Sequence, residues 1–432
     1  MTSNIALFSV LFLAVIVAIA FWRKCNIGIL AIGGAFILGT LSGMSGKEIL
    51  AGFDASLFLN LCGVSFLFSL AQVNGTLEYI CKKAIGLAGK RTYLVPILLF
   101  LVTGILCAIG PGNIPSGNLM TVVAVTLAVE MGANPLLFAL AAKVAANGFT
   151  LSPITPAGIL MDKLCTDAGY SASDFAIPSM VNLILWSCLL MVIFCIYYKV
   201  WKIKPAVQIS ASSTTVAQKM SKEQVITALG IVVMVIMVVG FSISVGLASF
   251  AVAAVLMALK TSDEKKALAK VPWGTLLLIT GMGVLMNVVL KAGGIDMISA
   301  ALLKVMSPVT AAPIMSLTAS ILSFFSSTTG VVMPTLIPTL DGIVTSLGTG
   351  TAGFVELAGV VVSGAMSAAF SPASTGGGLI MAAYMTASNS ENKEEEQNKL
   401  FGTLFVIALA CVALNVLFSF LGVYKLGYAL FG

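Results

Sequence analysis

Two short runs of serine, threonine, proline and glycine interrupt long apolar stretches of the sequence. Residues 150–158 read TLSPITPAG and residues 370–378 read FSPASTGGG, so that Ser371 follows Ser152 by 219 positions. Proline removes a backbone donor and glycine loosens a helix, so each run predicts a broken helix with unpaired amides and carbonyls. Inside a membrane, such groups persist only beside a water-filled cavity or a bound solute. Paired broken helices in two halves of one chain are typical of the substrate site of a transporter.

Two further polar turns divide apolar stretches into paired arms. Residues 110–118, GPGNIPSGN, divide the stretch 93–131, and residues 326–330, SSTTG, divide the stretch 309–346. Each arm of the first stretch has about 16 residues, roughly 24 Å of helix against a hydrocarbon core of about 30 Å. Two full crossings would place the polar turn at a membrane surface. We expect a re-entrant hairpin with its tip buried in the protein, because this also agrees with the charges of the loops.

Four helix starts are expected to meet near the middle of the membrane. Two follow the hairpin tips at Ser116 and Gly330, and two follow the breaks at Thr155 and Thr375. The free amides and positive ends of these helices favour a carboxylate or phosphate, whereas the carbonyls that end the preceding half-helices favour a cation such as sodium. Two anion-binding clusters, one in each half, suit a molecule with two negative ends. One carboxylate held by two pairs of contacts would give the same pattern.

The predicted substrate-binding residues are the uncharged polar side chains and glycines at these four places. They are Gly112, Asn113, Ser116, Asn147, Thr150, Ser152, Thr155, Ser326, Ser327, Thr328, Thr329, Gly330, Ser371, Ser374, Thr375 and Gly376. Sodium is a candidate ligand at Asn113, Ser152, Thr328 and Ser371. A serine or threonine in an apolar run more often bonds to its own helix than to a ligand, and the neighbouring prolines and glycines make these residues the exception.

Lys143 is the one basic residue inside a predicted span, and it lies one turn before Asn147. A charge at this depth is costly, so the lysine is a functional candidate. Its ammonium could neutralise an anion, or it could occupy the place of a sodium ion and make transport proton-linked. The structural alternative is that its stem extends from a short half-helix to the inner headgroups.

The composition excludes a soluble protein and leaves little room for an enzyme. Of 432 residues, 59% are hydrophobic and 9% are charged, and the mean hydropathy is +1.07, which indicates an all-α polytopic membrane protein. Histidine is absent, as are HExxH, Walker and GxSxG motifs, so an intramembrane enzyme is not expected. The eight cysteines show no CxxC spacing and are expected to be reduced packing residues. A channel is the remaining alternative, and it predicts neither saturation nor counterflow.

The same order of elements occurs twice along the chain. We expect a first repeat over 1–200, with a hairpin at 93–131 and a broken helix at 135–164, and a second over 223–432, with a hairpin at 309–346 and a broken helix at 354–386. Residues 201–222, rich in Ser, Thr and Lys, are expected to form a cytoplasmic linker. Each repeat then crosses the membrane five times, an odd number, so the two repeats are inverted.

The basic residues support this topology and predict its orientation. The first apolar segment, 5–21, is followed by Arg23 and Lys24, so it should be a retained span that starts outside. With that start, 17 basic residues fall inside and five fall outside, with Lys143 left within a span. The net charge of +6 therefore indicates orientation, and nucleic-acid binding is not expected. Both termini are predicted to lie outside a plasma (inner) membrane.

Three segments carry a resemblance to a known family. Residues 52–59 (GFDASLFL), 71–76 (AQVNGT) and 148–154 (GFTLSPI) resemble the MatC-type dicarboxylate (malonate) carrier family, over roughly the first 160 residues. The whole plan is similar to the ion-transporter superfamily that includes divalent anion/sodium symporters. In that superfamily a Ser-Asn-Thr motif at each hairpin tip binds a carboxylate, and each tip with its neighbouring break binds sodium. Here only Asn113 and the run Ser326–Thr329 correspond to that motif.

The sequence thus predicts a secondary active transporter of a small dicarboxylate, malonate or a C4 acid, coupled to sodium or protons. The resemblance implies a homodimer and an elevator motion of the hairpin-bearing part. The expected partners are a small organic anion, the lipid bilayer and a second copy of the chain. No cofactor is expected, with sodium ions as the candidate exception. The alternative function is a sodium/proton antiporter, or a carrier of another organic or inorganic anion on the same scaffold.

Overall fold

The computed structural model describes residues 2–23, 25–86, 91–203, 219–241, 243–324, 326–372, 374–387 and 392–432. These residues form helices joined by short loops, and none of them lies in a β-strand. Six helical segments within these ranges are long and apolar enough to cross a membrane, and several shorter helices are also apolar. The predicted all-α membrane class is confirmed. Most of the predicted linker, residues 204–218, lies outside the described ranges.

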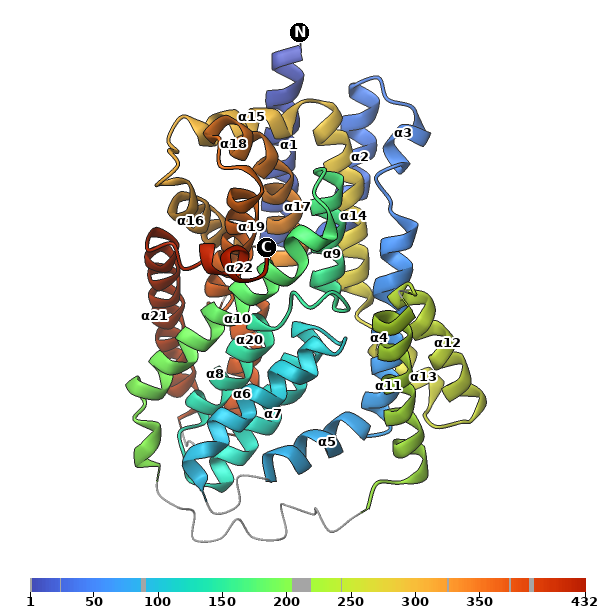
Figure 1. Ribbon diagram of the computed structural model, residues 1–432, viewed down its shortest axis with the longest axis vertical. Coiled ribbons are helices and arrows are strands. Elements are labelled where there is room, and N and C mark those ends of the chain that lie inside the picture. The colour runs from blue at the N-terminus through green and yellow to red at the C-terminus, as the bar shows by residue number, and fades with distance from the viewer. Residues whose placement is uncertain are drawn as a thin grey trace.

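The helices of the first half follow the predicted order (Figure 1). They are α1 (Thr2–Arg23), α2 (Ile27–Leu41), α3 (Gly46–Leu50), α4 (Ala55–Val73), α5 (Thr76–Ile85), α6 (Val95–Ala108), α7 (Asn113–Glu130), α8 (Pro135–Gly148), α9 (Pro156–Asp167) and α10 (Ala172–Tyr197). The predicted first hairpin corresponds to α6 and α7, and the predicted first broken helix corresponds to α8 and α9.

The second half contains a counterpart of each of these helices, about 219 residues further along. They are α11 (Lys222–Phe241), α12 (Val245–Ala258), α13 (Glu264–Lys270), α14 (Trp273–Lys291), α15 (Gly294–Leu303), α16 (Ala311–Phe324), η4 (Thr328–Val332), α17 (Met333–Leu336), η5 (Ile337–Thr339), α18 (Leu340–Leu347), α19 (Gly350–Ala368), α20 (Thr375–Ala387) and α21 (Lys393–Phe420). A last helix, α22 (Lys425–Phe431), follows. The first and last residues of α9 and α20, for example, differ by 219 and 220 positions.

The outgoing arm of the second hairpin is less regular than its counterpart. The first hairpin returns as the single helix α7, whereas the second returns as η4, α17, η5 and α18 in succession. Pro334 and Pro338 lie in this arm, and each removes one backbone donor from the helical ladder. Pro115 takes the position of Pro334 in the first hairpin, but Leu119 takes that of Pro338. The second proline therefore accounts for the additional break.

One bundle of the structure is held together by close approach of helix backbones. Helix α2 packs against α14, and α4 packs against α12. A Cβ atom added to Gly281 would lie 2.3 Å from the carbonyl oxygen of Gly28, and one added to Gly63 would lie 2.6 Å from that of Gly246. Small residues at such crossings allow the backbones to touch, which is a common basis of helix packing in membranes. We call α1–α4 together with α11–α14 the frame bundle.

The other bundle contains both hairpins and both broken helices, and we call it the hairpin bundle. Helices α6 and α7 pack on α8, and α16 packs on α19. Helix α10 contacts both α8 and α19, and the short α22 is tied to it because the amide of Gly427 donates to Asn182 Oδ1 at 2.9 Å. Helix α20, which is the second part of the second broken helix, contacts α7 and α8 of the first half. The two halves therefore interlock within this bundle (Figure 1).

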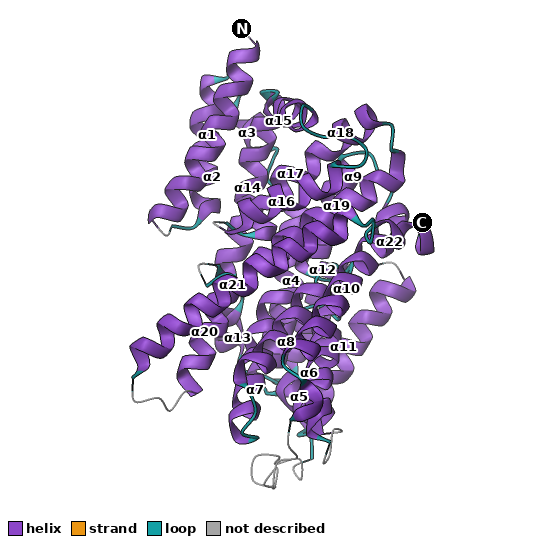
Figure 2. Ribbon diagram, turned by 90° about the vertical axis from the view of Figure 1, so that its left-hand side faces the viewer, coloured by secondary structure: helices purple, strands orange, loops and turns teal. Residues whose placement is uncertain are grey.

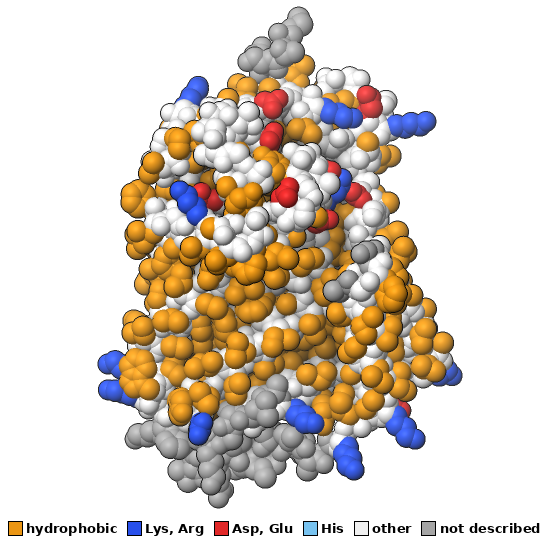
Figure 3. Space-filling view, viewed as in Figure 1, with side chains coloured by type: hydrophobic (Ala, Val, Ile, Leu, Met, Phe, Trp, Pro, Cys, Tyr) orange, Lys and Arg blue, Asp and Glu red, His pale blue; other side chains and the backbone are white. Residues whose placement is uncertain are grey.

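Apolar side chains form a broad band around the middle of the face seen in Figure 3, and charged side chains lie toward its two ends. Phe36, Leu41 and Val406 are examples of large apolar residues that are more than 60% exposed. In a soluble protein so many exposed apolar residues would cause aggregation, whereas lipid covers them without cost. Helices α15 and α18 lie at one end of the molecule and α5 at the other (Figure 2).

Candidate functional site

The first break is shaped by two hydroxyl groups that bond to the backbone. Thr155 precedes α9 and its Oγ1 accepts a hydrogen bond from the Gly158 amide at 3.1 Å, which makes it the N-cap. The same hydroxyl points at the carbonyl oxygen of Ser152 at 2.8 Å and at that of Thr150. Ser152 Oγ donates to the carbonyl oxygen of Ala108 at the end of α6, at 2.7 Å. Both side chains hold the break in place and fasten it to the first hairpin.

The second break repeats this geometry at positions shifted by 219. Ser374 Oγ accepts from the Gly377 amide at 3.2 Å and lies 2.7 Å from the carbonyl oxygens of both Ser371 and Ala369. Thr375 begins α20, and its side chain lies outside what the structure describes. The ring of Phe370 packs edge-on against Phe194 of α10, with ring centroids 6.4 Å apart. As in the first break, the predicted site hydroxyl of Ser374 is used by the backbone.

The tip of the first hairpin is buried, and it touches both the first break and the second half. Gly110 and Gly112 have positive φ angles of 146° and 76°, which only glycine adopts easily. A Cβ atom on Gly112 would lie 2.9 Å from Cδ of Pro156, so the tip presses on the start of α9. Asn113 Nδ2 lies 3.8 Å from the sulfur of Met366 in α19. The tip therefore reaches both broken helices.

Two of the predicted helix starts lie earlier than expected. Helix α7 begins at Asn113 and not after Ser116, because Pro115 is tolerated in the first turn, where its missing amide has no helical partner to lose. In the second hairpin, η4 begins at Thr328, before Gly330, because Ser327 caps it by accepting from the Gly330 amide at 3.3 Å. The starts after Thr155 and near Thr375 are where the sequence predicts them.

The tip of the second hairpin bonds mainly to itself and packs against the frame bundle. Ser326 Oγ donates to the carbonyl oxygen of Leu322 at 2.6 Å. Thr328 Oγ1 lies 3.5 Å from Ser323 Oγ, and Thr329 Oγ1 lies 3.5 Å from Ser327 Oγ. At Gly330 the tip meets α14, since a Cβ atom there would lie 1.5 Å from Cδ2 of Leu278. These hydroxyls are local to the hairpin.

The two broken helices meet at corresponding residues. Asn147 Nδ2 donates to the carbonyl oxygen of Met366 at 3.3 Å, across α8 and α19. Asn147 Oδ1 and Thr150 Oγ1 are fully buried without a hydrogen-bond partner among the described residues, and Ser116 Oγ on the neighbouring α7 is in the same state. Buried polar atoms almost always have partners, so unpartnered ones mark places for water or a ligand. Three residues of the predicted site, Ser116, Asn147 and Thr150, thus each have a buried oxygen that could bind a ligand.

Lys143 extends from α8 into the contact between α7 and α20. Its side chain is 4% exposed. Its Nζ lies 3.6 Å from the place of a Cβ atom on Gly117 of α7, and 3.2 Å from that of a Cβ atom on Gly376 of α20. Within the described part of the chain, the ion pairs involve other lysines, so this ammonium has no carboxylate partner. This position disagrees with the alternative in which the stem extends to the headgroups.

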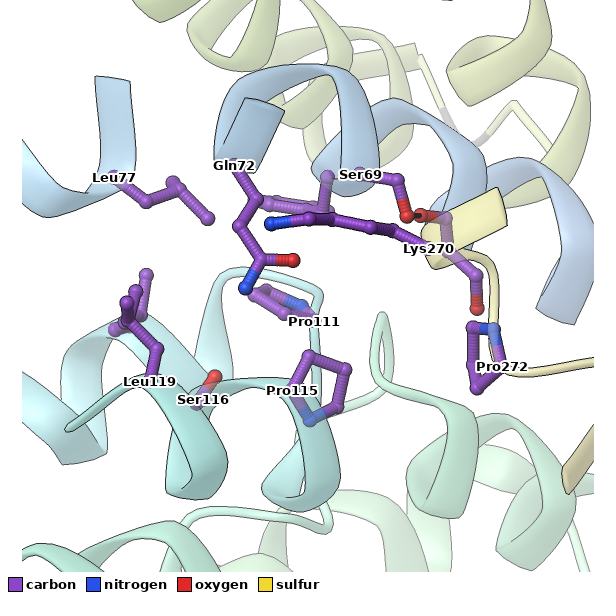
Figure 4. A pocket seen from close by; sticks show the side chains of 12 residues that line it. Ser69, Gln72, Leu77, Pro111, Pro115, Ser116, Leu119, Lys270 and Pro272 are labelled. Carbon is purple, nitrogen blue, oxygen red and sulfur yellow. Dashed lines mark hydrogen bonds between the residues drawn. The ribbon is translucent and has the colours of Figure 1, made fainter. Parts of the chain in front are cut away.

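Two cavities lie at corresponding places in the two halves and differ greatly in size. The first, of about 20 Å³, lies between α4, the first hairpin and the end of α13. Figure 4 shows Gln72 and Lys270 on one side of it and Pro111, Pro115 and Ser116 on the other. Its volume leaves room for no more than a water molecule.

The second cavity has about 760 Å³ and opens between α4, α9, α14 and the second hairpin. Pro334 and Pro338 line this cavity, and the corresponding residues of the first half, Pro115 and Leu119, line the first cavity. Lys163 lies at this cavity between Asp54, at 3.3 Å, and Asp167, at 2.6 Å. Neither these three charged residues nor Met366 were among the predicted site residues, because charged residues near helix ends and a methionine in an apolar run give no distinct signal.

Comparison with known families gives one match. Residues 1–150 match the family model described as "Dicarboxylate carrier protein MatC N-terminus". The matched residues include the first hairpin, α8 with Lys143 and Asn147, and the start of the first break. A comparison with curated proteins gave no match. The resemblance read from the sequence is confirmed by the family match.

Proposed function

We propose, since residues 1–150 match the family model of the N-terminal part of the MatC dicarboxylate carrier, that the chain is a secondary active transporter of a small dicarboxylate. Malonate and C4 acids are the proposed substrates, and sodium or protons are the proposed coupling ions. The observation that carries the proposal is the meeting of the two broken helices at Asn147 and Met366, where buried polar atoms have no hydrogen-bond partner among the described residues. Such a site at the crossing of two broken helices is where transporters of this build bind their substrates.

We further propose that residues 1–200 and 223–432 are inverted repeats. In support, each helix from α1 to α10 has a counterpart about 219 residues later. Corresponding elements also lie toward opposite ends of the molecule, as α5 and α15 do in Figures 1 and 2. In this proposed arrangement, each repeat crosses the membrane five times and each hairpin is a re-entrant segment. From the basic-residue pattern, we propose that both termini lie outside the plasma (inner) membrane.

The unequal cavities support alternating access between the two sides of the membrane. Inverted repeats place a cavity of the same kind on each side, and here one has about 760 Å³ and the other about 20 Å³. We infer that this conformation is open on the side of α15 and α18 and closed on the side of α5. In the opposite conformation, the large cavity would lie on the side of α5 and the small one on the side of α15 and α18. We propose that the hairpin bundle moves against the frame bundle in an elevator motion, in a homodimer.

The proposed substrate contacts are Asn113, Ser116, Asn147 and Thr150 with the amides of the neighbouring helix starts. Sodium is proposed at two places, near Asn113 and Ser152 in the first half and near Thr328 and Ser371 in the second. The support is chemical: hydroxyl, amide and carbonyl oxygens are the ligands that a hard cation prefers. Within the described residues of the four breaks there is no carboxylate. That composition disfavours a sodium/proton antiporter, which usually carries acidic residues in its ion path.

Transport into proteoliposomes tests this function. The full-length protein is reconstituted, and uptake of labelled malonate and succinate is measured with sodium and proton gradients imposed separately. Protein-free liposomes serve as the control. We expect saturable uptake that one of the two gradients drives, and counterflow of label against unlabelled substrate. Uptake that does not saturate would indicate a channel, and uptake of neither acid would rule out the proposed substrate class.

A further inference from the structure

We propose that the Lys143 ammonium receives one carboxylate of the transported acid, while the other end of the acid is held by uncharged groups. The inference rests on the proposed function and adds to it the charge distribution of the site. It assigns the ammonium to the substrate and not to the place of a sodium ion.

The position of Lys143 is built into the packing of three helices. The lysine projects from α8, and its side chain passes the second residue of α20, Gly376. A Cβ atom at Gly376 would lie 2.7 Å from Cε of the lysine, so this glycine provides the room that the lysine needs. On the other side, Gly117 in the second turn of α7 faces the ammonium. The ammonium therefore lies between the second turn of α7 and the first turn of α20.

The ammonium lies near the N-terminal ends of two helices and, among the described residues, has no anionic partner. The N-terminal ends of α7 and α20, helices of 18 and 13 residues, each carry a partial positive charge. Within the described residues no aspartate or glutamate pairs with Lys143, and the nearby Cys107 thiol donates to the Ala146 carbonyl oxygen at 3.2 Å. An unpaired charge that is 4% exposed is strongly unfavourable. A bound anion would remove this cost.

A carboxylate fits this place because its acceptor-only oxygens match the ammonium donor. A hydrogen bond between an ammonium and a carboxylate is charge-assisted, and such bonds are about twice as strong as neutral ones. Ser116, one residue before Gly117 in α7, is 1% exposed, and its Oγ has no partner in the described part of the chain. It also lines the small cavity.

The second half has no equivalent of this cation. The residue 219 positions after Lys143 is Val362, which is fully buried in α19. α19 therefore has no basic side chain at the position that Lys143 occupies in α8, and Lys163 of the neighbouring α9 is already paired with Asp54 and Asp167. A dicarboxylate would be held by a charge at one end and by neutral donors at the other. Such a site should accept an acid whose second carboxylate is replaced by a neutral amide.

Binding of malonic acid derivatives to the full-length purified protein tests the inference. The probes are malonate, its monoamide and its diamide, and calorimetry gives the Kd of each for the wild type, Lys143→Met and the control Lys304→Met, which removes a charge at the end of α15. We expect the monoamide to bind the wild type within about tenfold of malonate. We expect the diamide, and malonate with Lys143→Met, to bind at least about 100-fold more weakly. The control should bind like the wild type.

Each other result has a defined meaning. If Lys143→Met does not fold, Lys143→Gln, which keeps a polar end, is measured in its place. Unchanged malonate affinity in the Lys143 variant overturns the inference, as does malonate binding that becomes sodium-dependent only in that variant, because the ammonium would then stand in for sodium. If the wild type binds neither malonate nor succinate, the proposed function fails. Sulfate binding that Lys143→Met abolishes would then still support an anion at this lysine.

Discussion

Asn147 donates to the carbonyl oxygen of Met366, and the two residues occupy corresponding positions of the two halves, 219 residues apart. A contact between corresponding positions is what a two-fold relation between the halves produces on its axis. The broken helices α8 and α19 thus cross at the residues that precede their breaks. A ligand bound there touches both halves at once, so neither half can form the site alone.

Loss of the Asn147 side chain should weaken both folding and transport. Asn147→Leu leaves the buried Met366 carbonyl without its donor, and we expect a loss of about 1–3 kcal/mol in unfolding free energy. Thermal unfolding in detergent measures this, with the exposed Asn398→Leu as the control. Transport by the variant should fall further than its folded fraction accounts for. A variant as stable as the wild type would show that the bond contributes nothing.

The capping hydroxyl of Thr155 should be replaceable by serine and not by valine. Thr155→Val keeps the shape but removes the acceptor of the Gly158 amide, at an expected cost of about 1 kcal/mol. Because the cap sets the geometry of the break, the KM for malonate should rise several-fold. Thr155→Ser retains the hydroxyl and serves as the matched control. Equal KM values for the two variants would show that the cap does not affect substrate binding.

The two cavities should differ in access from water. In a background with the exposed Cys25 and Cys188 replaced by serine, we introduce Asn287→Cys at the large cavity and Ser69→Cys at the small one. A membrane-impermeant maleimide should label position 287 at least about tenfold faster than position 69 in the conformation described. A substrate that favours the opposite state should reverse this order. Equal rates in all conditions would contradict unequal cavities.

If Lys143 pairs with the substrate, exchange should be faster than net transport. The empty carrier has to return with an unpaired buried ammonium, whereas exchange returns it with a bound acid. We expect efflux of labelled malonate from proteoliposomes to rise about tenfold when unlabelled malonate is added outside. In Lys143→Met, measured at saturating malonate, this stimulation should disappear. Stimulation that persists in the variant would place the slow step elsewhere.

The sequence predicted the helices and breaks well because their signals are local. The stretch 93–131, predicted as the first hairpin, forms α6 and α7, and the prolines and glycines indicate both breaks. The sequence could not show that the hydroxyls of Thr155 and Ser374 cap helices whereas that of Thr150 has no partner among the described residues, because the partners of a hydroxyl depend on how the chain folds. Nor could it predict unequal cavities, because one sequence has to support both conformations of a transporter.

The glycine contacts within the frame bundle have a mechanical consequence. The helix backbones are in contact at Gly28 with Gly281 and at Gly63 with Gly246, so these helices cannot easily slide past one another. In the proposed elevator motion, displacement of the hairpin bundle would be absorbed by the segments that connect it to this stiff core. Two of these connectors are α5, between α4 and the first hairpin, and α15, between α14 and the second. They would act as a pair of lever arms, one at each membrane surface.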